Sequence, residues 1–139
     1  MKKIAIFALI ILTSCLASCS LDDDDINFSF EQISIEEVDI PDEFTRGEIY
    51  EISTFYFRPS DCHSFSGFSL DRISNEIFLA VQNVVVNDRP CEDLEETQLI
   101  EESFDFFVGA EDSYIFAFWQ GIDDQGENQF LIIEVPVVE

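Results

Sequence analysis

Residues 114–138 read YIFAFWQGIDDQGENQFLIIEVPVV and carry the strongest structural signal in this chain. In residues 114–119, Tyr and Phe at the even positions alternate with Ile, Ala and Trp at the odd positions. This is the period of two that a half-buried β-strand requires. Residues 121–128 are rich in Asp and Gly, as hairpin loops are, and residues 130–138 are mostly apolar. We therefore predict a β-hairpin at this end of the chain.

The same alternation recurs upstream, in short segments that Asp, Gly and Pro interrupt. Segments 73–86 and 104–108 are examples. The first also fits one apolar face of a helix, but its Val residues at 84–86 favour a strand. Residues 28–35 and 47–57 show the pattern again. About six or seven strands at this spacing predict one antiparallel β-sandwich of immunoglobulin-like kind, with about seven strands. A small β-barrel is the alternative.

Two connecting segments and one irregular segment separate these strands. Residues 38–42 contain Pro41, whose nitrogen cannot donate to a sheet, so we predict a turn there. Residues 64–70 form a short irregular strand or a loop around Gly67, and residues 91–97 form an acidic loop or a short helical turn.

Most aromatic side chains on these strands are predicted to fill the core. Tyr56 and Trp119 point to the opposite face of their strands and are the two rings to consider for ligand binding. The predicted core aromatics are Phe55, Phe57, Phe106, Phe116 and Phe118.

The N-terminal segment has the features of an export signal. Lys2 and Lys3 precede an unbroken apolar run at residues 4–12, which is too short to cross a membrane as a helix. The tetrapeptide LASC at residues 16–19 follows in place of an A-x-A cleavage site. It resembles the lipobox of bacterial lipoproteins. That resemblance implies cleavage before Cys19 and attachment of a diacylglyceryl group to the Cys19 thiol.

The tetrapeptide LTSC at residues 12–15 also fits a loose lipobox, with Cys15 as the modified residue. Its use would shorten the signal and leave Cys19 unexplained, so we predict Cys19 as the site of lipid attachment. The four aspartates at residues 22–25 then resemble the surface-export signal of lipoproteins from the Bacteroidota. This resemblance implies the outer face of the outer membrane.

The predicted organisation is a lipoprotein signal peptide at residues 1–18, an acidic tether at 19–26 and a β-sandwich domain at 27–139. Residues 114–138 are also similar to the C-terminal ends of small flavobacterial lipoproteins, a likeness that implies no activity.

The charge of the chain restricts its partners. All thirty acidic residues follow the predicted signal, together with only Arg46, Arg58, Arg72 and Arg89, so the side chains beyond residue 18 carry a net charge of −26 with His63 neutral. Such a surface repels the phosphates of nucleic acids and of anionic membranes, which leaves the lipid as the membrane anchor. Fourteen of the fifteen phenylalanines also follow the signal, which is too much apolar material for a disordered tail.

Cys62 and Cys91 are predicted to form a disulfide, because an exported domain meets oxidising conditions. Closing this loop stabilises the fold by about 3–4 kcal/mol in the chain-entropy model. A metal site of Cys62, His63 and Cys91 is the rival interpretation. No second His and no Met follow the signal, so a blue-copper site is short of ligands and a zinc site would need a carboxylate as its fourth ligand.

The sequence contains few candidates for other chemistry. Its sole histidine adjoins Cys62, no G-x-S-x-G motif is present, and its paired acids are typical of solvated loops. Oxygen ligands for calcium are offered by Asp123, Asp124, Glu127 and Asn128, but their spacing differs from that of an EF-hand. The sequence does not decide whether a calcium ion binds there. No cofactor is predicted.

We therefore predict a surface-displayed outer-membrane lipoprotein whose β-sandwich module has a non-enzymatic binding, adhesion or accessory role, for an unknown protein or carbohydrate ligand. A small carboxylate-dependent hydrolase and a purely structural envelope component are the alternatives.

Overall fold

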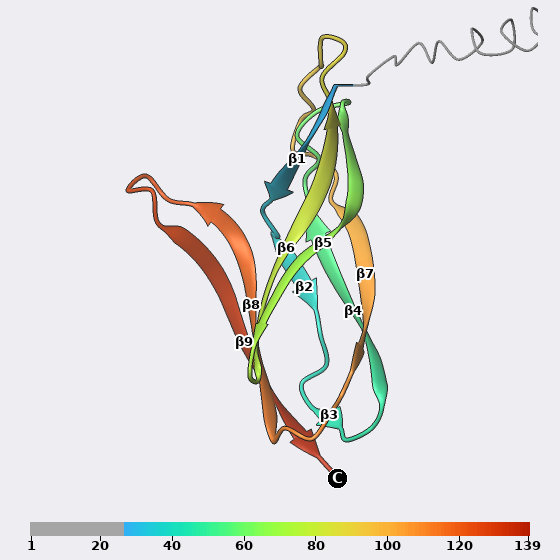
Figure 1. Cartoon of the computed structure of the whole chain (residues 1–139), viewed down its shortest axis with the longest axis vertical. Helices are drawn as coiled ribbons and strands as arrows, with labels where there is room; N and C mark the ends of the chain where they lie inside the picture. Colours follow the sequence, from blue (N-terminus) through green and yellow to red (C-terminus); the bar gives the residue numbers. More distant parts are fainter. Residues whose placement is uncertain (1–26) are drawn as a thin grey trace, which may run out of the picture.

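The computed structural model describes residues 27–139 (Figure 1). Cys15, Cys19 and the aspartates at residues 22–25 lie outside the described residues, so the predictions for them stay predictions. Within residues 27–139 the fold is all-β, with nine strands and no helix. That part of the chain accordingly has no helix long and apolar enough to span a membrane.

The strands, in chain order, are β1 (Phe28–Ile33), β2 (Glu37–Asp39), β3 (Phe44–Thr45), β4 (Ile49–Tyr56), β5 (His63–Ile73), β6 (Glu76–Val86), β7 (Ile100–Phe107), β8 (Ser113–Ile122) and β9 (Asn128–Val138).

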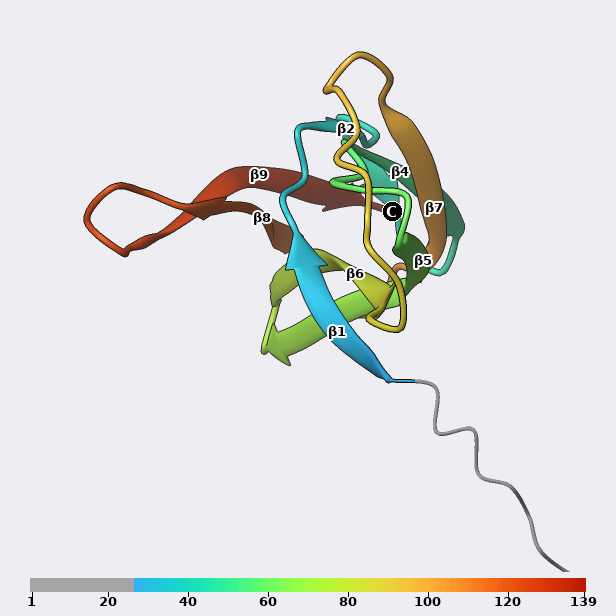
Figure 2. The same ribbon diagram turned by 90° about the horizontal axis from the view of Figure 1, so that it is seen from above.

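The larger sheet is organised around the long strand β6. β5 runs antiparallel along the whole of one edge of β6. Two strands share the other edge, with β1 antiparallel beside residues 81–86 and β8 parallel beside residues 76–79. β9 pairs with β8, and the short strand β3 pairs in parallel with the end of β9. The three-stranded sheet has the order β2-β4-β7 and lies opposite (Figures 1 and 2).

The core lies between the two sheets and is rich in aromatic rings. The Phe116 ring of β8 lies 5.1 Å from that of Phe106 on β7, and this edge-to-face contact joins the sheets. Such pairs add about 0.5–1.5 kcal/mol beyond the burial of their area. The largest fully buried side chains include Phe44, Ile52, Tyr56, Leu79, Tyr114, Phe116 and Phe118.

The predicted C-terminal hairpin is confirmed as β8 and β9. Its turn is closed by the Asp123 amide, which donates to the Glu127 carbonyl over 2.9 Å. A bulge between Trp119 and Gly121 shifts the register of the pair. Because a bulge bends the strand that contains it, the tip of the hairpin swings away from β1 and β6 (Figures 1 and 2).

The all-β class and the two packed sheets are as predicted, whereas the strand count and the pairing are not. Nine strands replace about seven, and the pairs β6–β8 and β3–β9 are parallel. Alternation within a strand does not reveal the direction of its neighbour, and strands as short as β2 and β3 contain almost no period. Val38 and Asp39, predicted in a turn, form most of β2. Immunoglobulin-like connectivity stays a prediction.

Two predicted strands at residues 64–86 form one long hairpin. Residues 63–73 form a continuous strand, β5, where the sequence predicted a short irregular strand or a loop, and a bulge between Phe65 and Gly67 accounts for the irregular pattern. The strand predicted for residues 73–86 is confirmed as β6, which begins at Glu76 after a turn.

One prediction about burial, that for β4, was wrong, and the sequence left the inner face of β1 undecided. On β4 the even-numbered residues face the core, so Tyr56 is only 1 % exposed, while Phe55 and Phe57 are half-buried. On β1, Phe28 and Phe30 lie on the outer face and are more than half exposed. Period two alone does not say which of two apolar faces meets the opposite sheet. Phe106, Phe116 and Phe118 are buried as predicted.

Candidate functional site

The strongest candidate for a binding site is a hollow of about 200 Å³ on the outer face of the larger sheet. Its lining residues come from β1, β5, β6, β8 and β9. Figure 2 shows how the β8–β9 hairpin extends away from β1 and β6. Ala80 of β6 lines the hollow, and because the Ala80 side chain is small, the floor stays open beneath the larger side chains around it.

Three aromatic side chains line this hollow: Phe78 of β6, Trp119 of β8 and Phe130 of β9. The sheet register places them together, because Trp119 pairs directly with Phe130 across β8 and β9. The rings of Phe78 and Phe130 are 5.9 Å apart and nearly perpendicular, with an interplanar angle of 79°. The Trp119 indole Nε1–H donates to Asn128 Oδ1 over 2.9 Å, and this bond orients the indole ring.

Four polar side chains complete the wall of the hollow, and they are Gln32, Ser69, Asp71 and Asn128. Gln32 Nε2 donates to Ser69 Oγ over 3.1 Å. Asp71 pairs with Phe78 across β5 and β6, so its carboxylate lies on the same face as the aromatic rings. Among the residues that line the hollow, Asp71 is the only one with a charge.

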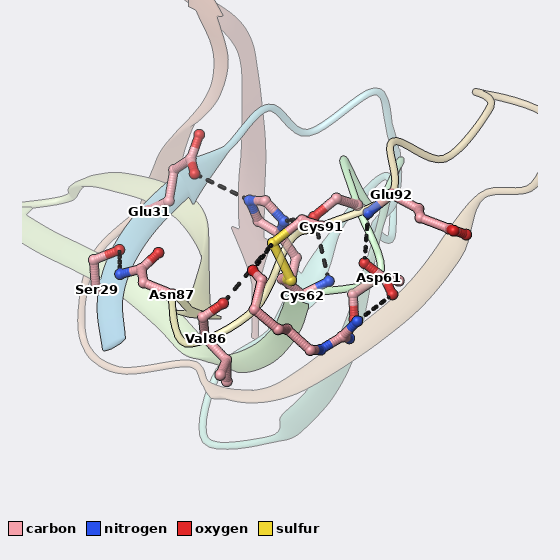
Figure 3. The surroundings of a disulfide bond; sticks show 11 residues. Ser29, Glu31, Asp61, Cys62, Val86, Asn87, Cys91 and Glu92 are labelled. Carbon is pink, nitrogen blue, oxygen red and sulfur yellow. Dashed lines mark hydrogen bonds and ion pairs between the residues drawn. A yellow bond between two sulfur atoms is a disulfide. The ribbon is translucent and has the colours of Figure 1, made fainter. Parts of the chain in front are cut away.

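A second group of interacting polar residues surrounds the disulfide, which is confirmed between Cys62 and Cys91 (Figure 3). The bond joins residues 29 positions apart, with their Cα atoms 5.5 Å from each other. It ties the start of β5 to the long loop between β6 and β7.

Asp61, which precedes Cys62 in the chain, also holds the loop between β6 and β7, through hydrogen bonds to residues on either side of Cys91. Its carboxylate accepts from Arg89 Nη1 over 2.7 Å and from the Glu92 amide over 2.9 Å. These two hydrogen bonds, that of Arg89 first, hold the pKa of the Asp61 carboxyl below its ordinary value. The loop is therefore fastened by one covalent bond and one charged hydrogen-bond network.

His63 is buried beside the disulfide, and both of its ring nitrogens lie within hydrogen-bond distance of protein oxygens. Its Nδ1 lies 2.7 Å from Ser60 Oγ, and its Nε2 lies 3.0 Å from Glu31 Oε2. Ser60 Oγ also accepts from the Cys62 amide over 3.3 Å, so its own hydrogen is free to donate to Nδ1. In that arrangement the Nε2–H of a neutral His63 donates to Glu31, and β1 is joined to the β4–β5 connection.

Ser60, His63 and Glu31 have the residue types of a hydrolytic triad, and sequence reasoning missed the grouping because Glu31 is distant in the chain. The Ser60 side chain lacks access to a substrate, because the residue is only 3 % exposed and lines neither the hollow beside Trp119 nor a second hollow beside Arg58. We interpret the three residues as a structural network.

The second hollow lies under the loop between β6 and β7, where Arg58 faces Glu95, Thr97 and Gln98. Within residues 27–139 the Arg58 guanidinium has no ion pair, and its buried Nε has no hydrogen-bond partner. Burial and the negative charge of Glu102 raise the pKa of the Tyr56 phenol above its ordinary value. The positive charge of Arg58 favours a lower pKa, but its effect is smaller.

The candidate calcium ligands do not converge in the described part of the chain. The carboxylate of Asp123 is occupied within its own turn, where it accepts from the amides of Gln125 and Glu127, each over 2.9 Å. The cluster of metal-ligand type that does come together in residues 27–139 is Asp61, Cys62 and Cys91, whose sulfurs form the disulfide.

The two aromatic residues that the sequence selected for ligand binding lie in different environments. Trp119 lies in the hollow, while Tyr56 is in the core. Asn128, selected as a candidate calcium ligand, also lines the hollow, where it accepts a hydrogen bond from Trp119. The remaining residues of the hollow were missed. Apart from Leu79, which belongs to the core, their signal is an outward-facing position on a strand, and it becomes visible only when the registers of β1, β5, β6, β8 and β9 are known.

No protein-family model, no curated protein and no solved structure matches this chain.

Proposed function

We propose that this chain is a lipid-anchored protein of a bacterial outer membrane that displays residues 27–139 as a non-enzymatic binding module. The anchor rests on the tetrapeptide at residues 16–19 and on the aspartates that follow it. The observation that carries the binding role is the hollow on the outer sheet face, where three aromatic side chains meet four polar ones. Concave sites lined by aromatic rings with a few placed polar groups are typical of ligand binding.

The hollow supports binding over hydrolysis because of its charged groups. Carboxylate-dependent glycoside hydrolysis uses two acidic side chains on either side of the bond that breaks. Asp71 is the single acid that lines the hollow. The network of Ser60, His63 and Glu31 likewise supports a structural role, since Ser60 and His63 are buried and none of the three residues lines either hollow.

Metabolic labelling with radioactive palmitate tests the anchor. The wild-type chain and the Cys15→Ala variant are expected to take up the label, whereas Cys19→Ala is expected to take up none. Equal labelling of Cys19→Ala would contradict the anchor at this residue, and loss of labelling in Cys15→Ala alone would move it to the earlier cysteine.

Protease treatment of intact cells tests the display. The wild-type domain is expected to be cleaved from outside, because its tether would hold it on the outer face. A variant with all four aspartates at residues 22–25 changed to Asn is expected to keep its lipid and become protected. A protected wild-type protein would place the domain inside the outer membrane.

A further inference from the structure

We propose that the hollow beside Trp119 binds the alkylammonium head group of its ligand. This inference rests on the proposed binding role and specifies the ligand class for the same site. The shared chemistry is a cation that carries alkyl groups, whether on a small quaternary amine or at the end of a lysine side chain in a protein.

The aromatic residues provide the first reason. A ring attracts a cation through the negative potential over its face, and Trp does so most strongly. Trp119, Phe78 and Phe130 all line the hollow. Because the last two rings are nearly perpendicular, they form a corner and not a flat platform. A corner suits a compact, rounded head group better than a flat sugar ring.

Charge provides the second reason. Asp71 is the one ionised group that lines the hollow, and within residues 27–139 its carboxylate has no ion pair or hydrogen bond to a side chain. Its neighbour Arg72 lies on the opposite face of β5, where the guanidinium carbon is 5.4 Å from the centre of the Tyr114 ring. The whole domain adds a negative potential that concentrates cations near its surface.

Size and hydrogen bonding provide the third reason. A hollow of about 200 Å³ is smaller than the roughly 300–1,000 Å³ of sites that enclose a drug-sized ligand. It therefore fits one group of a larger molecule. Three of its four polar side chains already form hydrogen bonds, Gln32 with Ser69 and Asn128 with the Trp119 indole. Fewer free partners remain for the hydroxyl groups of a sugar, while the Asp71 carboxylate stays available to a cation.

Trp119 makes the test direct, because it is the only tryptophan in the chain and its fluorescence reports on the hollow. The full-length chain, purified in a non-ionic detergent, is titrated with choline and with the uncharged isostere 3,3-dimethylbutan-1-ol. Choline is expected to change the Trp119 emission with saturation, and the isostere is not. A lysine-containing peptide and its acetylated form are titrated in parallel, to distinguish a protein-borne cation from a small amine.

Two variants and a matched control define the site. Asp71→Asn keeps the shape of the side chain and is expected to weaken choline binding about 5-fold. Phe130→Leu keeps an apolar group but removes a ring, and is expected to weaken it by about 2-fold to 5-fold. Asp105→Asn removes an exposed acid from β7, in the other sheet, and is expected to leave the affinity within about 1.5-fold of the wild type.

Saturable quenching by choline that Asp71→Asn weakens and Asp105→Asn does not would support the inference. It would be overturned if neither choline nor the lysine peptide changed the emission, or if Asp71→Asn bound choline as the wild type does. Maltose is titrated as a sugar control. If maltose quenched the emission and choline did not, the hollow would still be a binding site, but the proposal of a cationic ligand would be overturned. Failure of the anchor would appear separately, in the palmitate experiment, and would not affect this titration.

Discussion

At the scale of the residue, the face of the strand on which a side chain lies determines its contribution to stability. Phe116 of β8 is fully buried, whereas Ile132 of the adjacent strand β9 is 66 % exposed. The Phe116 ring lies 5.8 Å from that of Phe118 and 5.1 Å from that of Phe106, so its removal leaves a cavity among rings. The two positions form a matched pair for mutation.

We expect Phe116→Ala to lower the free energy of unfolding by about 3–5 kcal/mol, because lost burial and the cavity both destabilise. Ile132→Ala is expected to stay within about 0.5 kcal/mol of the wild type. Urea unfolding followed by far-UV circular dichroism measures both. A similar loss for the two variants would contradict the assignment of the inner and outer faces.

Asp61 gives a second prediction at this scale, for the response to pH. Its pKa is lowered in the fold by the bonds from Arg89 and the Glu92 amide. The ordinary value in an unfolded chain is about 3.9, so the stabilisation is complete above that pH. It is lost as the pH falls through the lower pKa of the folded state, when the carboxylate is protonated.

The amide proton of Glu92, which donates to Asp61, reports this titration in nuclear magnetic resonance spectra. Its shift is expected to titrate with a midpoint below about 3.9, and the Asp61→Asn variant is expected to lack that transition. A midpoint at or above the ordinary value would show that the network does not favour the ionised carboxylate.

At the scale of the element, the disulfide controls the loop between β6 and β7. Replacing Cys62 and Cys91 together by Ala is expected to lower the free energy of unfolding by about 3–4 kcal/mol, the chain-entropy value for a loop that spans 29 positions. Urea unfolding with and without a reducing agent measures the effect. Reduction is expected to destabilise the wild type equally and to leave the double variant unchanged. If the reducing agent also destabilised the double variant, the stability lost by the wild type on reduction could not be attributed to the Cys62–Cys91 bond.

Some of the strands and their pairings could be predicted from the sequence, and others could not. The hairpin of β8 and β9 was predictable because ten or so alternating residues on each side of an Asp–Gly turn specify it locally. The faces of β1 and β4 were not, because both carry apolar side chains on both faces. The parallel pairing of β6 with β8 depends on contacts between residues about 39 positions apart, which no local pattern records.

At the scale of the whole molecule, we expect the large negative charge to lower the stability of the folded domain. Side chains that carry a charge of −26 beyond residue 18 repel one another in the compact state. Salt screens this repulsion, and the Debye length is about 10 Å at 0.1 M ionic strength. We expect Tm to rise with added NaCl by about 4–8 °C for each 1 kcal/mol of repulsion removed.

The shape of the salt dependence identifies its cause. Screening is expected to complete most of the rise by about 0.3 M, since the Debye length is then only a few ångströms. A rise that stayed linear to molar concentrations would point to exclusion of salt from the protein surface. A Tm that fell with added salt would contradict net repulsion in the folded domain.

The sequence alone determined the all-β class, the C-terminal hairpin, the disulfide and the negative charge. Each of these depends on a local period, on a count of residue types or on a pair of cysteines in a chain predicted to be exported. The lipid anchor at Cys19 belongs to the same kind of inference and stays a prediction. Trp119 was also selected from the sequence, as an aromatic ring opposite the core.

Tertiary structure decided which faces of β1 and β4 are buried, which strands run parallel, and what surrounds Trp119. The hollow combines Gln32, Asp71, Phe78 and Asn128 with that ring, from strands scattered over about 100 positions. Its shape depends on a bulge that bends the hairpin and on the sharing of one edge of β6 by two strands. These features are set by the register between distant segments, because the interactions that select a register form only when the strands meet.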